Sequence, residues 1–157
     1  MVNHMAQGAA TSMEDGAFLG RCLAHVIKGS LNMAQAIEIY EKGRMPKAHI
    51  KQQVSFLNGA VWQLPDGRAQ QARDAALEPE LRGEPLMRSP NLYSDPTTVL
   101  EVYGYNAEAD ADEKIAAFLN SGHKSRDQRT GVTAAQAEKY MNWFLPESEK
   151  MRIRSNL

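Results

Sequence analysis

Apolar side chains recur at steps of three and four residues over most of the chain, the spacing that puts them on one face of a helix. The clearest such segment runs from residue 13 to residue 27. Thr11 and Glu14 have the spacing of a capping box, in which each side chain accepts a hydrogen bond from the other residue's backbone N–H. Gly29 can leave the right-handed helical conformation without strain, so the first helix is expected to end there.

A second helix is expected to begin after Asn32, whose side chain can form a capping box with Gln35 three residues on. The apolar face of this helix is predicted to consist of Met33, Ile37 and Tyr40. Gly43 and Pro46 should interrupt the helix, because proline has no N–H to donate and suits the first turn of a new segment.

The new segment keeps the helical spacing until a strong turn signal, Leu64-Pro65-Asp66-Gly67, interrupts the chain. The apolar positions of this segment are Ile50, Val54, Leu57 and Val61. A short helix is expected over residues 69–77, and Pro79 should prevent it from continuing.

The second half of the chain alternates between loops and helical periods. Residues 83–96 are rich in proline and polar residues and are expected to form a loop. Residues 97–105 leave two alternatives open, a strand favoured by their β-branched side chains or a short helix. A helix over 107–119 begins with acidic residues, which the helix dipole favours at that end. A last helix is expected over 133–144, and the charged tail after it is expected to fray.

These helical periods occur without the alternation of strands and helices that builds a parallel sheet. The sequence also has no Gly-x-Gly-x-x-Gly fingerprint, which marks the pyrophosphate site of a dinucleotide-binding fold. The expected fold class is therefore mainly α, with no Rossmann sheet in this chain.

The composition is that of a folded protein without a strong charge of either sign. Apolar residues make up 43% and charged residues 24% of the sequence, which is typical of globular proteins. The formal net charge of −1 provides no field that would attract nucleic acid. Cys22 is the sole cysteine, so the chain can form no internal disulfide. No apolar run is long enough to span a membrane and no secretory signal is present, so a cytoplasmic protein is expected.

The first residues of the chain carry a recognisable motif. The sequence reads His-Met-Ala-Gln-Gly-Ala-Ala over residues 4–10 and Glu-Asp-Gly-Ala over residues 14–17. Together they resemble the flavin-contacting loop and the following helix of FAD-dependent aromatic hydroxylases, the salicylate-hydroxylase-like monooxygenases. The resemblance implies that the cofactor FAD contacts Gln7, Gly8, Ala9 and Ala10.

Such a segment has a physical rationale. A reduced flavin ring carries negative charge along one edge, and backbone N–H groups at a helix N-terminus stabilise that charge without reorganising. Gly8 lets the backbone approach the ring closely, and the small Ala9 and Ala10 keep that approach open. The alternative is that these residues merely form a loop that enters a helix, with Glu14 and Asp15 as ordinary acidic residues of a first turn.

Further stretches, as far as about residue 112, resemble the same family. They are Tyr40-Glu41, Arg44-x-Pro46-Lys47-Ala48, Ser55, Asn58, Trp62, Leu64-Pro65-Asp66-Gly67, Gln70-Gln71-Ala72-Arg73-Asp74, Asp95-Pro96 and Tyr103-Gly104-Tyr105-Asn106-Ala107-Glu108. Three positions depart from the family pattern, since Asn3 stands at a proline position, Gln63 replaces a common His and Asn106 replaces an Asp. Residues after Lys114 show no family feature.

The resemblance implies a helical C-terminal fragment of an α/β flavin monooxygenase, which hydroxylates an aromatic or similar small molecule with FAD, NAD(P)H and O2. Its regions would be the flavin loop and following helix over 1–30, a helical region over 31–122, and a charged loop, last helix and tail over 123–157. The dinucleotide-binding part would be missing, so this chain alone is expected to be inactive. Its partners would be an N-terminal flavin-binding chain or a second copy of itself.

A second hypothesis stays open, in which the chain is a non-catalytic helical interaction module or a truncated relic of such an enzyme. Arg44 and Arg73 are interpreted as ion-pairing cations rather than as ligands of a substrate or cofactor. No histidine has metal-ligand spacing to another histidine, to the cysteine or to a carboxylate cluster, so no metal site is expected.

Overall fold

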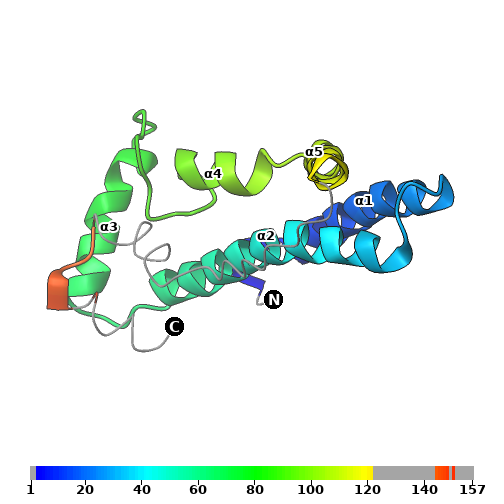
Figure 1. Cartoon of the computed structure of the whole chain (residues 1–157). Coiled ribbons are helices and arrows are strands. Elements are labelled where there is room, and N and C mark those ends of the chain that lie inside the picture. The colour runs from blue at the N-terminus through cyan, green and yellow to red at the C-terminus, as the bar shows by residue number, and fades with distance from the viewer. Residues whose placement is uncertain (1–2, 122–143, 149, 151–157) are drawn as a thin grey trace. The chain divides into compact units, whose positions relative to one another are not determined.

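The computed structural model describes residues 3–121, 144–148 and 150, and this part of the chain contains helices and no strand (Figure 1). The elements are a short 3-10 helix η1 (Asn3–Met5) and the α-helices α1 (Gly8–Ile27), α2 (Met33–Trp62), α3 (Arg68–Leu81), α4 (Pro96–Tyr103) and α5 (Ala107–Asn120). The expected mainly-α class is confirmed. Residues 97–105, for which a strand was the alternative, are largely helical. The helix expected over 133–144 lies, except for its last residue, outside the described part.

The chain divides into two compact units, which we describe separately. The α1–α5 unit contains, among the described residues, 7–50 and 106–121. The α3–α4 unit contains residues 3–6 and 51–105 together with the described residues after 143. These two units are defined by which residues lie close together in space. The division of the chain after residues 30 and 122 that the sequence analysis expects stays a prediction.

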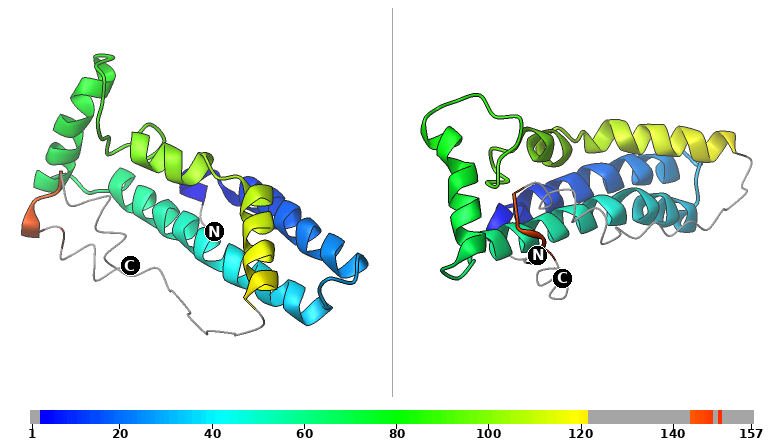
Figure 2. Two further views of the ribbon diagram at one scale, coloured as in Figure 1. Left: turned by 45° about the horizontal axis from the view of Figure 1, so that its top comes forward. Right: turned by 90° about the vertical axis from the view of Figure 1, so that its left-hand side faces the viewer.

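In the α1–α5 unit, α1 and the first part of α2 lie side by side and α5 packs across α1 (Figure 2). The core residues of this unit are Phe18, Cys22, Leu31, Ala36, Ile39, Ala107, Ala111 and Ile115. The Phe18 ring meets Tyr40 edge to face, with ring centroids 6.2 Å apart. The apolar face expected for α2 was wrong at Met33 and Ile37, which are exposed, whereas Tyr40 contacts the core through Phe18. The small residues Ala36 and Gly43 face the core instead, since they leave room for α1 to approach.

Both ends of the connection between α1 and α2 follow the sequence signals. Gly29 adopts a left-handed φ of +74° and its N–H bonds to the Val26 carbonyl, which ends α1 as expected. Asn32 and Gln35 form the expected capping box, in which each backbone N–H donates to the other residue's side-chain oxygen at 2.9 Å.

Helix α2 runs through Pro46 without a break, so the expected interruption was wrong. A proline inside a helix removes one hydrogen bond and costs about 3 kcal/mol. The preceding turn is fixed by tertiary contacts, because Phe18 packs on Gly43 and Arg44 binds two carboxylates of α1. These contacts outweigh the local preference of the sequence, as tertiary packing often does.

Helix α3 likewise continues through Pro79 and ends at Leu81, four residues beyond the expected end. Glu80 explains the extension, since its carboxylate accepts hydrogen bonds from Ser89 and Ser94 Oγ and from Asn91 Nδ2 at 2.6–2.9 Å. These bonds tie the last turn of α3 to the following loop, which we call the Glu80 clamp. Gly83 then takes a left-handed φ of +70°.

The loop after α3 ends at a buried cap. Asp95 is 1% exposed and its carboxylate accepts from both the backbone N–H and the hydroxyl of Thr98, each at 2.9 Å. Pro96 follows as the first residue of α4, where its missing N–H has no cost. The core of this α3–α4 unit consists of Met5, Val54, Leu57, Val61, Ala69, Leu92, Val102 and Leu145.

Helix α5 begins as the sequence predicts. The Asn106 side chain accepts from the Ala109 N–H at 3.0 Å, and Glu108 and Asp110 lie in the first turn. No helix in the described part of the chain has the length and apolar character needed to cross a membrane.

Candidate functional site

The residues expected to contact a cofactor form the beginning of α1. Gln7 is the N-cap residue, and Gly8, Ala9 and Ala10 are the first three residues of the helix. The first backbone hydrogen bond of the helix runs from the Thr11 N–H to the Gln7 carbonyl at 2.9 Å. The N–H groups of Gly8, Ala9 and Ala10 therefore have no acceptor within the helix, as at every α-helix start.

No side chain caps this end of α1. The capping box expected between Thr11 and Glu14 was wrong, because the helix starts three residues before Thr11. The Thr11 and Ser12 hydroxyls donate backwards to the carbonyls of Gln7 and Gly8, at 2.7 Å and 3.1 Å. Both hydroxyls are thus used inside the helix and leave the leading N–H groups uncovered.

The start of α1 is open to solvent. Gly8 and Ala9 are exposed, Ala10 is half-buried, and Gln7 is buried at 6% exposure. No atom lies within 4 Å of the position that a Cβ would occupy at Gly8. An uncapped helix start with exposed residues favours a negatively charged or electron-rich partner.

The residue before this start has an unusual backbone. Ala6 has φ of +49°, the sole positive φ of a non-glycine residue among the described residues. A left-handed alanine costs roughly 1 kcal/mol, because its Cβ approaches the following carbonyl oxygen. Such a conformation persists where the residues on either side are held in place.

The residues before Ala6 are held by α2, within the α3–α4 unit. Asn58 Nδ2 donates to the His4 carbonyl at 2.6 Å, and Met5 is fully buried. A Cβ at Gly59 would lie 2.4 Å from Cδ2 of the His4 ring, so the ring packs directly on the glycine backbone.

Glu14 and Asp15 do not lie in the first turn of α1, contrary to the simple interpretation of them as first-turn acids. Both bind Arg44 of α2, whose Nε is 2.7 Å from Asp15 Oδ1 and whose Nη2 is 2.9 Å from Glu14 Oε2. The Arg44 side chain is 2% exposed, against 18% and 32% for its partners. The interpretation of Arg44 as an ion-pairing residue is confirmed.

Arg73 also pairs rather than reaching toward an open site. Its guanidinium binds the Asp74 carboxylate and donates to the carbonyls of Val61 and Trp62, at 3.0 Å and 3.3 Å. Those carbonyls are among the last four of α2, for which the helix itself supplies no N–H donor. The guanidinium also lies over the Trp62 ring, 5.8 Å from its centroid. Arg73 therefore caps α2 from α3.

Comparison with known proteins places these features in a family context. OpS4 of Beauveria bassiana (strain ARSEF 2860), an FAD-dependent monooxygenase, is 34% identical over 121 residues, which cover 74% of this chain and 26% of OpS4. The 6-hydroxynicotinate 3-monooxygenase of Pseudomonas fluorescens is 47% identical over 58 residues, 37% of this chain and 14% of that enzyme. This chain is thus similar to part of each of these two monooxygenases.

A third monooxygenase, the salicylate hydroxylase of Pseudomonas putida, is 35% identical over 66 residues, 42% of this chain and 15% of that enzyme. The chain thus spans about a quarter of OpS4 and a smaller share of the other two monooxygenases. No family model and no solved structure matches the chain. The likeness is that of a fragment of such an enzyme.

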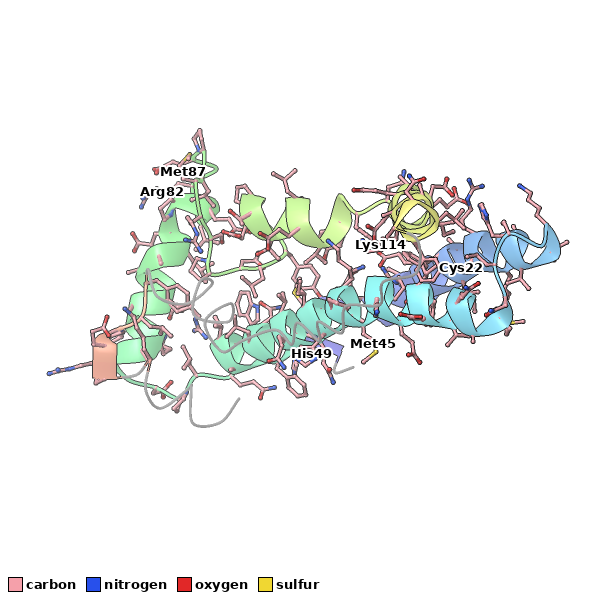
Figure 3. The ribbon with its side chains drawn as sticks, viewed as in Figure 1. Cys22, Met45, His49, Arg82, Met87 and Lys114 are labelled. Atoms are coloured by element: carbon pink, nitrogen blue, oxygen red, sulfur yellow. The ribbon has the colours of Figure 1, made fainter. Side chains whose placement is uncertain are left out.

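The histidine, methionine and cysteine side chains discussed next do not indicate a second reactive site in the described part of the chain. The described residues contain no group of three or more histidine, cysteine or acidic side chains that could hold a metal ion. His49 and Met45 lie on the outer side of α2, and Cys22 lies inside the α1–α5 unit (Figure 3). Burial raises the pKa of the Cys22 thiol, which makes it a poor nucleophile.

Sequence reasoning noted Asn58 within the family pattern but did not assign it a role, and it missed Gly59 altogether. A signal was present, because Asn58 falls four residues after Val54 on the apolar face of α2. A polar residue in that register must be buried, and a buried amide needs partners. The sequence does not predict that His4 is this partner, because His4 and Asn58 are 54 positions apart.

Proposed function

We propose that this chain is the part of an FAD-dependent monooxygenase that presents the start of α1 to the electron-rich edge of the flavin ring. The observation that carries the proposal is the uncapped, exposed helix start at Gly8–Ala10, in a chain related to three monooxygenases over part of its length. A helix N-terminus stabilises negative charge through its free N–H groups and the helix dipole.

The described residues fit that role. When bound, FAD supplies the redox chemistry by which NAD(P)H and O2 hydroxylate an aromatic or similar small substrate. The N–H groups of Gly8, Ala9 and Ala10 would donate hydrogen bonds to the ring edge as it becomes negatively charged. The open space at the Gly8 Cβ position admits a flat ring against the backbone. Gln7, whose side chain is buried, would contribute through its backbone.

FAD needs more protein than this. The described residues form no sheet with a dinucleotide-binding loop, and a flavin held at one ring edge gains few contacts. We therefore propose that activity requires the remaining part of the enzyme, which must hold the adenine and pyrophosphate groups. That part belongs either to the same polypeptide or to a separate one.

A chimera of OpS4 tests the proposal. The matched 121-residue segment of OpS4 is replaced by the corresponding part of this chain, and FAD retention and NAD(P)H oxidation are measured. We expect the chimera to retain FAD and to oxidise NAD(P)H, while this chain alone does neither. FAD retention with NAD(P)H-dependent O2 consumption by this chain alone would refute the requirement for further protein.

Two glycines of α1 provide a matched pair of variants for the chimera. Gly8 and Gly20 both have nothing within 4 Å of the Cβ position, but only Gly8 lies at the helix start. Gly8→Leu should weaken FAD retention at least about tenfold by blocking the approach of the ring, and Gly20→Leu should leave it unchanged. Equal FAD retention in the two variants would contradict the assigned contact.

A non-catalytic interaction module is the second candidate function, and exposed apolar side chains favour it. The largest exposed fractions in the α1–α5 unit belong to Met13, Met45 and Ile27, at 73%, 66% and 86%. Their burial by a flavin-binding chain or by a second copy would stabilise an assembly. Sedimentation of the chain alone separates the two partners, because only self-association raises its mass without an added protein.

A further inference from the structure

The connection between α3 and α4 carries two of the three most exposed large apolar side chains in the described part of the chain. Leu81, the last residue of α3, is 84% exposed, and Met87 is 88% exposed. Arg82 and Met87 lie at the tip of the α3–α4 unit, beyond the end of α3 (Figure 3). We call residues 81–88 the loop tip, because they present apolar side chains to solvent.

The base of the same loop is buried and hydrogen-bonded throughout. Ser89 joins two carboxylates, because its hydroxyl donates to Glu80 Oε2 at 2.6 Å and its backbone N–H donates to Asp95 Oδ1 at 3.0 Å. The Asn91 N–H donates in turn to Ser89 Oγ at 3.0 Å. Ser89 and Asp95 are each 1% exposed, so these bonds cannot be exchanged for bonds to water. They hold the base in one arrangement.

The first residues of the loop tip are held as well. The Gly83 N–H donates to the Glu80 carbonyl at 3.0 Å, and the Glu84 N–H donates to the Pro79 carbonyl at 2.9 Å. The chain therefore turns in a fixed way directly after α3. A segment that is ordered in advance loses little conformational freedom when a partner binds it. Order at the base and apolar side chains at the tip together favour a docking surface.

The charges around the loop tip are compensated within the unit. Arg82 binds Glu84 Oε1 through Nε at 2.6 Å and Glu78 Oε2 through Nη1 at 3.1 Å. Arg88 Nε lies 3.8 Å from Asp95 Oδ1. These residues leave no surplus of positive charge for nucleic acid or for an anionic lipid surface. The compensated charges favour an apolar pocket on a protein as the partner of the loop tip.

The size of the loop tip argues against a second copy of the chain as that partner. Complete burial of a leucine or methionine side chain removes roughly 100 Å² of apolar surface from water, so two loop tips against each other would bury roughly 400 Å². Stable protein pairs bury about 1,200–2,000 Å². The loop tip can therefore contribute only to a larger interface. The rest of a monooxygenase can supply one, because the match covers only 26% of OpS4.

We propose that Leu81 and Met87 dock into an apolar pocket on the flavin-binding part of the monooxygenase, and that the Glu80 clamp holds the loop tip in the docking conformation. The inference rests on the proposed function, because it names a surface through which this chain joins the remaining enzyme. The two apolar side chains supply the buried centre of the contact. Arg82 stays with its own carboxylates at the polar rim.

The oxidation of Met87 tests the proposal in the whole chain and in the OpS4 chimera. Dilute hydrogen peroxide transfers one oxygen atom to the methionine sulfur and leaves water, and mass spectrometry follows the sulfoxide at each methionine. We expect Met87 to oxidise at least about tenfold more slowly in the chimera than in the chain alone, because the pocket excludes peroxide. Slow amide hydrogen exchange within α3 shows that the chimera is folded.

Substitution by glutamine removes the apolar contact and keeps a long side chain with good helix propensity. The double variant Leu81→Gln with Met87→Gln is compared with Leu100→Gln, since Leu100 is 74% exposed on α4 of the same unit. In the chain alone, neither variant should change the urea midpoint, because all three side chains are exposed. In the chimera, the double variant should speed hydrogen exchange at residues 82–88 at least about tenfold, and Leu100→Gln less than about twofold.

The outcomes separate this inference from the proposed function. Slow oxidation of Met87 in a folded chimera that does not retain FAD counts against the proposed function alone. Retention of FAD with Met87 oxidised as fast as in the chain alone overturns the docking proposal, and so does an equal effect of Leu100→Gln. A chimera that does not fold counts against both.

Two further measurements on the chain alone identify a different occupant. Protection of Met87 that increases with the concentration of the chain would assign the loop tip to a second copy. Protection by phosphatidylcholine vesicles would assign it to a lipid surface. Either result would overturn docking on the remaining part of the enzyme.

Discussion

Buried side chains with paired charges hold the α1–α5 unit together at the scale of single residues. Arg44 is 2% exposed and joins Glu14 and Asp15, whereas the Arg21–Asp112 pair of α1 and α5 has side chains 48% and 44% exposed. Hydrogen bonding to Arg21 lowers the pKa of the Asp112 carboxyl, yet solvent screens this pair. The burial of each ion pair, rather than its geometry, should therefore decide how much its arginine contributes to the free energy of unfolding.

Replacing each arginine by alanine tests this difference. Arg44→Ala should lower the free energy of unfolding by about 3 kcal/mol, because it leaves two partly buried carboxylates without their cation. Arg21→Ala should lower it far less, because solvent screens an exposed ion pair. Urea denaturation measures both changes. Comparable losses in the two variants would mean that Arg44 is not the buried bridge described here.

The sequence alone predicted such residue roles unevenly. It favoured ion pairing for Arg44 and Arg73, because arginine beside acidic helices most often pairs. It placed a capping box at Thr11 and Glu14, although the helix begins at Gly8 and the Thr11 hydroxyl bonds inside it. The residue spacing of a capping box is necessary for that motif, but it does not determine where the first turn of the helix forms.

At the scale of elements, the helices were predictable from apolar spacing, but their ends and interruptions were not. The ends at Gly29, Asn32 and Asn106 follow local signals that need no tertiary contact. Pro46 and Pro79 were expected to stop helices, and both lie inside them. Contacts with distant residues hold each proline's neighbours in helical geometry, and a local pattern does not contain those contacts.

Close packing of α1 on α2 depends on Gly43. A Cβ there would lie 2.4 Å from Cζ of Phe18 and 3.1 Å from Cδ of Lys114, and the same position at Gly20 is open. Gly43→Ala should destabilise the protein by about 1–3 kcal/mol through overpacking, despite its better helix propensity. Gly20→Ala should stabilise it by about 0.5–1 kcal/mol. Thermal unfolding compares the two, and stabilisation by both would show that α1 lies farther from α2.

The Glu80 clamp should make the end of α3 sensitive to acid. Burial raises the pKa of the Glu80 carboxyl, but hydrogen bonds from Ser89, Ser94 and Asn91 together outweigh it, so the net pKa is lowered. A lowered folded-state pKa contributes stability that is complete above the unfolded value of about 4.3 and is lost as the pH falls through the folded value.

Comparison with Glu80→Gln tests this acid sensitivity. The wild type should be more stable than the variant at neutral pH, and the difference should shrink as the pH falls below about 4.3. Urea denaturation across a pH series measures the difference. A difference that stays constant down to pH values well below the carboxylate range would exclude a titrating role for Glu80.

At the scale of the whole molecule, sequence motifs indicated which enzymes the chain resembles, and the structure added the geometry of one helix start. The motifs from His4 to about residue 112 pointed to flavin monooxygenases, and the chain is similar to part of three monooxygenases. The mainly-α class followed from the absence of any strand–helix alternation. The anchoring of η1 by Asn58 did not follow, because it joins residues 54 positions apart.

The most direct test of the central claim compares the two helix starts of the α1–α5 unit. Helix α1 begins with the uncapped Gly8–Ala10, whereas α5 is capped by Asn106 and begins with acidic residues. Riboflavin carries no phosphate, so it probes the ring alone. Riboflavin is added in large excess, so that the few contacts of one ring edge still give partial, weak binding to the chain alone. In amide spectra of the whole chain, reduced riboflavin should shift Gly8–Ala10 more than oxidised riboflavin does and should leave residues 107–109 unchanged. Equal shifts with oxidised and reduced riboflavin, or no shift at Gly8–Ala10, would contradict the assignment of this helix start to a flavin.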